Sequence, residues 1–172
     1  MTTSAELLVD GFGRIRENVE DVLSGLTPDQ LARQVAPGAN PISWLVWHLT
    51  RVQDDHVAKA FGAEQIWSSG GWARRFGLRP STMDIGYGHS ASQVTEIGAA
   101  TASAELLAEY HEATHAQTVK LVAEVTNADL DRIVDTHWTP HVTLAVRLVS
   151  VLDDDMQHSG QAAYIRGLLL RD

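Results

Sequence analysis

The sequence contains no cysteine. Without thiols the chain can form no disulfide and offers no thiolate ligand to a metal. Any thiol chemistry would therefore need a thiol that the substrate or cosubstrate brings.

Basic residues are also scarce: the chain has 13 Lys and Arg against 22 Asp and Glu, which gives a net charge of −9. An acidic chain without a basic stripe argues against nucleic acid as the main partner and against binding to anionic membrane surfaces. No uncharged apolar run approaches the ~20 residues of a membrane span. Residues 1–6 lack the basic-then-apolar pattern of a signal peptide, so we expect a cytoplasmic protein.

What the sequence does contain suits one globular domain over residues 1–172, with 44% hydrophobic and 20% charged residues. Apolar residues recur at spacings of three and four, which predicts amphipathic helices. Long helices are expected at 5–24, 41–61, 101–125 and 140–170. Thr139-Pro140 reads as an N-cap followed by proline at the first helical position. The pattern predicts an all-α fold built as a four-helix bundle.

Residues 62–92 have a different character, because glycines alternate with the aromatic residues Trp67, Trp72, Phe76 and Tyr87. So long a loop between the second and third helices is uncommon inside a compact domain and is often functional. Two interpretations stay open, namely a lid or pocket wall, and a surface excursion held by its aromatic side chains.

The pair Asp154 and His158 lies four residues apart, which places both side chains on one face of a helix. His48, on the second helix, could supply a third ligand. Two imidazoles and one carboxylate can hold a divalent metal with a coordination position left open for chemistry. Asp55 lies seven residues after His48 and could accept a hydrogen bond from its imidazole.

The face of the fourth helix centred on His158 is apolar, so His158 should point into the bundle, with Asp154 closer to that direction than Asp155. An inward carboxylate needs a partner, which could be a metal or Arg147 on the same face. A hydrogen-bonded polar cluster without any metal is the alternative interpretation of His48, Asp154 and His158.

The run His111-Glu112-Ala113-Thr114-His115 matches the zincin string literally. The amphipathic stripe is weak at this point and no third histidine follows. We therefore favour two histidines on a largely solvated face over a protease site.

Two longer stretches resemble a known family. Residues 40–49 look like the second-helix motif of the DinB-like superfamily, and residues 154–161 look like its fourth-helix motif. Residues 65–67 and 71–78 are similar to the loop of an actinobacterial branch related to mycothiol-dependent enzymes. The resemblance covers nearly the whole chain.

The resemblance implies an antiparallel bundle in up-down-down-up order and a metal bound by His48, Asp154 and His158. Aspartate stands at position 154, where the common pattern has histidine. An oxygen ligand is compatible with zinc but shifts the preference toward harder metals. Zinc is the favoured metal, with nickel or manganese as alternatives.

The leading hypothesis is a metal-dependent transferase or isomerase that uses a low-molecular-weight thiol, with mycothiol favoured, on a small electrophilic substrate. Candidate substrate-binding residues are Trp47, Arg51, Trp67, Trp72 and Tyr87, with Arg51 placed to hold a carboxylate. The sequence assigns no catalytic residue beyond the ligands. A non-catalytic binding or stress-response module with a degenerate metal site is the main alternative. Metal-assisted hydrolysis is a weaker one. A homodimer is also plausible.

Overall fold

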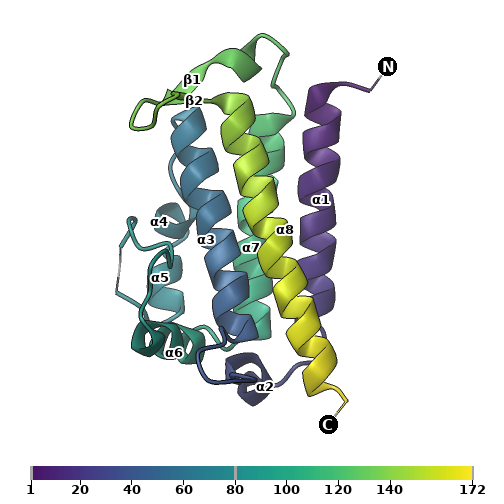
Figure 1. Cartoon of the computed structure of the whole chain (residues 1–172), viewed down its shortest axis with the longest axis vertical. Coiled ribbons are helices and arrows are strands. Elements are labelled where there is room, and N and C mark those ends of the chain that lie inside the picture. The colour runs from purple at the N-terminus through teal and green to yellow at the C-terminus, as the bar shows by residue number, and fades with distance from the viewer. Residues whose placement is uncertain (1, 80, 172) are drawn as a thin grey trace.

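The computed structural model describes residues 2–79 and 81–171. Four long helices form the body of the protein (Figure 1): α1 Ser4–Leu23, α3 Ile42–Phe61, α7 Ala104–Val122 and α8 Leu144–Leu169. Helix α1 packs against α7 and α8, and α3 packs against the same two helices. Helices α3 and α7 run in the direction opposite to α1 and α8 (Figure 1). The predicted all-α four-helix bundle is confirmed, with the order up-down-down-up.

Side-chain caps define where the long helices begin. Thr3, Ser103 and Thr143 each accept a hydrogen bond from a backbone N–H of the first turn, at α1, α7 and α8. Such caps satisfy donors that have no partner inside the helix. The prediction that the last helix begins at Pro140 is wrong, because α8 begins at Leu144. Residues 142–143 instead form β2 Val142–Thr143, which pairs antiparallel with β1 Ile133–Asp135.

Shorter elements complete the chain. Helix α2 Pro28–Ala32 and α6 Ala91–Ala100 close one end of the bundle, and the 3₁₀ turn Asp129–Asp131 lies before β1 (Figure 1). The expected long loop contains α4 Ile66–Ser69 and α5 Trp72–Arg75, so it is folded against the bundle. None of the helices in the described part of the chain combines the length and apolar character needed to cross a bilayer.

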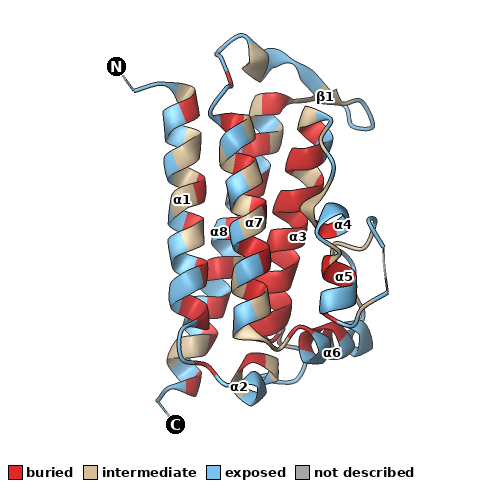
Figure 2. Ribbon diagram, turned by 180° about the vertical axis from the view of Figure 1, so that it is seen from behind, coloured by how far each residue is buried: buried red, intermediate tan, exposed pale blue. Residues whose placement is uncertain are grey.

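Helix α3 is the most deeply buried element (Figure 2), because α7 and α8 cover two sides and the segment between α3 and α7 covers a third. Its polar side chains therefore need partners inside the protein. Asp54 accepts the backbone N–H groups of Ile66 and Trp67 at 2.8 and 2.7 Å. It thereby satisfies the first turn of α4, which has no side-chain cap of its own.

Arg51 holds the same segment from one turn earlier on α3. Its guanidinium is fully buried and lies 3.4 Å from Asp54. It also donates to the side chains of Gln65 and Tyr110 and to the backbone carbonyls of Thr82 and Asp84, at 3.1 to 3.3 Å. One buried cation thus ties Gln65, Thr82 and Asp84 to the centre of the bundle.

We expect Arg51→Met to lower the free energy of unfolding by about 3–5 kcal/mol, because Asp54 would be left as a buried charge without its cation. Urea unfolding followed by circular dichroism measures the change. Arg14→Met is the matched control, because Arg14 forms only an exposed pair with Asp10 and should leave stability unchanged. Equal midpoints for the two variants would contradict the role assigned to Arg51.

Candidate metal centre

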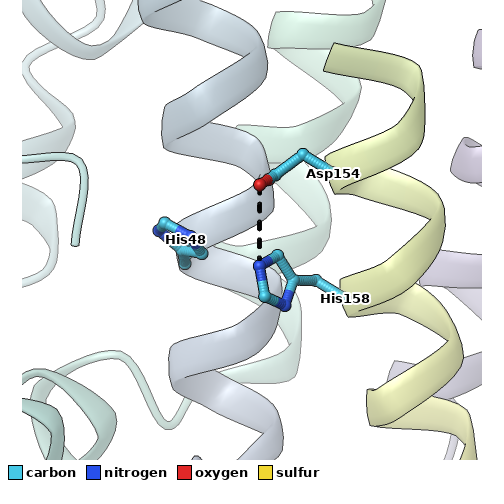
Figure 3. A group of neighbouring side chains, drawn as sticks. All are labelled: His48, Asp154 and His158. Carbon is cyan, nitrogen blue, oxygen red and sulfur yellow. Dashed lines mark ion pairs between the residues drawn. The ribbon is translucent and has the colours of Figure 1, made fainter. Parts of the chain in front are cut away.

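Three side chains from the second and fourth long helices meet at one point (Figure 3). The ligand atoms of His48, Asp154 and His158 all lie within 4.8 Å of one another. Nε2 of His158 is 3.7 Å from Oδ1 of Asp154, and the two imidazole rings are 4.8 Å apart at 70°. Within the described residues this is the one cluster of three or more potential ligands with such spacing.

Hydrogen bonds fix which nitrogen of each imidazole carries the proton. Nδ1 of His48 contacts the carbonyl oxygen of Ile85, and Nδ1 of His158 lies 2.9 Å from Oε1 of Gln161. Both partners are acceptors, so both Nδ1 atoms donate. Each Nε2 is then left with a lone pair, which is the arrangement that metal-binding histidines use.

Asp154 completes a donor set that fits a divalent metal. Its Oδ2 is buried and has no hydrogen-bond partner among the described residues. Two imidazole lone pairs and an unpartnered carboxylate oxygen match the nitrogen and oxygen ligands of zinc and of harder divalent ions. Arg147, the other partner considered for Asp154, instead pairs with Asp135 at 2.8 Å.

The orientation of the two neighbouring aspartates differs from the expectation. Asp155, not Asp154, faces the bundle interior and is fully buried, while the side chain of Asp154 is 32% exposed. Burial raises the pKa of Asp155 well above its usual range, and the neighbouring Asp154 adds to the shift. The α3–α8 contact, and not the bundle centre, is where Asp154 and His158 meet His48.

A loop segment covers His48 from the outside. We call Asp84–His89 the strap. The imidazole of His48 stacks on Trp44 at 4.6 Å, and a Cβ on Gly86 would come within 2.7 Å of its Nδ1. Gly86 has φ of +91°, a conformation that favours glycine. Burial under this cover lowers the pKa of His48, so its neutral, ligating form is favoured.

The strap is itself held by α3. Trp44 donates its indole N–H to Nδ1 of His89 at 3.2 Å, and Nε2 of His89 then donates to Asp84 at 2.8 Å. With the contacts from His48 and Arg51, side chains from three successive turns of α3 hold this segment.

The acceptor expected for His48 lies elsewhere. Asp55 accepts from the amide of Gln65 at 2.8 Å and pairs with His56 at 3.2 Å, while the Ile85 carbonyl takes the imidazole proton. The carbonyl comes from a loop 37 residues away in sequence, so periodicity along α3 could not reveal it.

The five candidate substrate-binding residues lie in different environments in the structure. Arg51 is buried and engaged with protein groups, so it is not available to a substrate carboxylate. Trp72 packs against Phe76 and Tyr110, and Tyr87 is 88% exposed, so neither lines a cavity with the others. Trp47 and Trp67 do line one cavity together, of about 400 Å³.

The second histidine pair is not solvated as expected. His111 is 1% exposed, and its Nδ1 lies 3.1 Å from Oγ1 of Thr50. Thr50 donates to the carbonyl of Val46, so His111 Nδ1 is the donor and its Nε2 keeps the lone pair. Burial lowers the pKa of His111 to about 3, with His115 and Arg16 adding to the shift.

Comparisons with known proteins identify a family and a structural relative. A family profile described as mycothiol-S-transferase matches residues 7–170. A crystal structure described as the conserved protein of locus from Enterococcus faecalis is 30% identical, with a TM-score of 0.87 over 100% of both chains. No protein in the curated set matches the chain significantly.

We expect His111 to make the fold less stable in mild acid. Its folded pKa of about 3 lies below the unfolded value, so only the unfolded chain takes up this proton as pH falls through about 6.5. Between pH 7 and pH 5 this removes about 2 kcal/mol of unfolding free energy. His111→Leu should reduce the loss seen in urea unfolding by that amount, whereas exposed His137→Leu should not. An unchanged pH dependence in His111→Leu would contradict this assignment.

Proposed function

Because the chain belongs to the mycothiol-S-transferase family, we propose that it is a metal-dependent enzyme that transfers a low-molecular-weight thiol to a small electrophile, or isomerises one. The thiol favoured by the family is mycothiol. The observation that carries the proposal is the cluster of His48, Asp154 and His158, in which one potential ligand atom of each residue lies within 4.8 Å of those of the other two.

The three residues would hold the metal, with zinc as the favoured ion. A metal bound there would lower the pKa of a coordinating thiol, so that the thiolate forms near neutral pH. The chain has no cysteine, so this thiol must come from the cosubstrate.

Access to the centre comes from the α8 side. His48 is 4% exposed beneath the strap, whereas the side chains of Asp154 and His158 are 32% and 19% exposed. A small cosubstrate can therefore approach past Asp154 and His158 without displacing the strap. The Ile85 carbonyl and the Gln161 amide would keep both imidazoles in their ligating tautomer throughout.

We expect purified tag-free protein to contain about one divalent metal per chain, and His48→Ala and Asp154→Ala to lose it. Elemental analysis measures the content. His137→Ala is the control, because that exposed imidazole lies outside the cluster. Absence of metal from every sample after incubation with excess zinc, nickel or manganese would instead favour a non-catalytic binding module.

The metal-loaded protein should consume model electrophiles only when mycothiol or another small thiol is present. Turnover that needs no thiol would point to metal-assisted hydrolysis. Metal binding without thiol binding or turnover would refute the proposed transfer.

A pair of glycines in the strap tests how His48 is held. Gly86 and Gly88 both have positive φ, but a Cβ on Gly86 meets His48, Trp47 and Trp44, while one on Gly88 meets nothing within 4 Å. Both alanine variants share the backbone strain of about 1 kcal/mol. We expect only Gly86→Ala to weaken zinc affinity, by about 10–100-fold in calorimetric titration. Equal affinities in the two variants would show that the strap does not position His48.

A further inference from the structure

Helix α8 presents an exposed apolar face in addition to the face that it buries in the bundle. Figure 1 shows α8 in front of the other long helices, so that its outer face is turned to the viewer. Large apolar side chains on that face are between 50% and 61% exposed, namely Val146, Val149, Met156 and Leu170. Exposed apolar residues that gather on one face of a helix, as here, indicate an interaction surface.

The spacing of these residues is that of a helix–helix contact. Alternate steps of three and four residues connect a set that we call the α8 seam: Val146, Val149, Asp153, Met156, Gly160, Ala163, Gly167 and Leu170. All are exposed except Gly167, which is half-buried. An average step of 3.5 residues keeps a seam aligned along two helices that pack side by side. The core residues of α8, such as Leu148, Val151 and Ala162, are not part of this set.

Two glycines of the α8 seam have no packing reason within the chain. A Cβ added to Gly160 or Gly167 would meet nothing within 4 Å among the described residues. At Gly11 of α1, by contrast, an added Cβ would come within 3.2 Å of Leu152. Glycine inside a helix costs about 1 kcal/mol relative to alanine. Gly160 and Gly167 therefore leave gaps on the exposed face that side chains of another molecule can fill.

The order of large and small residues makes the α8 seam complementary to itself. A twofold axis at the level of residue 158 would place Met156 opposite the partner's Gly160, and Val149 opposite the partner's Gly167. Each large side chain then enters the gap left by a glycine, which is knobs-into-holes packing. A contact of this kind uses the same surface on both copies, as a twofold dimer requires.

Charge selects the antiparallel arrangement over the parallel one. Asp153 is the one charged residue of the α8 seam, and its carboxylate accepts from Gln157 of the same helix at 2.8 Å. In a parallel pair the two Asp153 carboxylates would face each other, and like charges repel. The antiparallel pair sets them about 15 Å apart along the helix axis, which exceeds the Debye length at physiological salt.

The length of the α8 seam is sufficient for a weak but specific interface. Residues 146–170 span about 36 Å, and a helix pair of that length buries roughly 600 Å² on each copy, at the lower end of specific interfaces. Asp154 and His158 leave α8 on a different side, toward α3 (Figure 3), so they lie outside the α8 seam.

We propose that the α8 seam binds the α8 seam of a second copy of this chain in antiparallel orientation, which forms a twofold dimer. The dimer depends neither on a bound metal nor on the proposed enzyme activity.

Sedimentation velocity on metal-free protein between about 1 and 200 μM tests the association, for which we expect a dissociation constant on the order of 10 μM. Met156→Lys should weaken dimerisation at least about 100-fold, because twofold symmetry places the new charge in the apolar contact twice. Met83→Lys is the matched control, because Met83 is 80% exposed but lies in the loop before α6, and it should leave the dissociation constant unchanged. Circular dichroism checks that both variants are folded.

Disulfide cross-linking tests the orientation, and the absence of cysteine from the chain makes every thiol an introduced one. Val149→Cys and Gly167→Cys are prepared as separate single variants and oxidised with diamide, alone and mixed. We expect a disulfide-linked dimer only in the mixture, because the antiparallel pair places residue 149 beside the partner's residue 167. A mixture of Val149→Cys with Met83→Cys is the control and should stay uncross-linked.

Four results would overturn the proposal. A wild-type protein that stays monomeric at 200 μM would leave this face to a different partner. Equal dissociation constants for Met156→Lys and Met83→Lys would place the dimer contact elsewhere. Cross-linking of Val149→Cys alone and of Gly167→Cys alone would show a parallel pair. A wild-type dimer whose mixed cysteine variants do not cross-link would also exclude the antiparallel contact.

Discussion

The structure depends on how α3 satisfies the backbone of the segment that follows it. Carbonyl groups at Thr82, Asp84 and Ile85 lie against a deeply buried helix, where each needs a donor. Arg51 supplies the first two and His48 supplies the third. The hydrogen bond that satisfies the Ile85 carbonyl also fixes the tautomer of His48. The contact that places the loop at Ile85 therefore also orients the imidazole of His48, so a change in one would alter the other.

The strap separates two different environments. His89 and Asp84 line the cavity beside α3, while Ile85 and Gly86 contact His48, with only this short segment between them. A displacement of the strap would therefore also move the carbonyl group that accepts the His48 imidazole proton.

The helices and the triad could be predicted from sequence because both depend on local spacing. Apolar periodicity marks the long helices, and the i,i+4 interval of Asp154 and His158 places them together. The strap could not be predicted, since the Ile85 carbonyl meets His48 across 37 residues and every residue has a carbonyl. The acceptors of Arg51 could not be predicted for a related reason. A guanidinium that can bind a substrate carboxylate can equally bind Asp54 and loop carbonyl groups. The burial of His111 could not be predicted either, because its partner Thr50 lies on another helix.

Asp154 and Asp155 are one helical step apart, and that step gives their carboxylates different burial. The two carboxylates are adjacent, yet Asp154 keeps 32% of its side chain exposed beside His158. Asp155 is fully buried, and neither of its oxygens has a hydrogen-bond partner among the residues that the structure describes. Burial raises the pKa of Asp155, and the charge of Asp154 raises it further, so the buried acid is favoured in its neutral form. A divalent metal held by the two neutral imidazoles and Asp154 would then have one carboxylate charge from α8 beside it instead of two. It would keep a net positive charge, which would favour binding of the anionic thiolate in the proposed reaction.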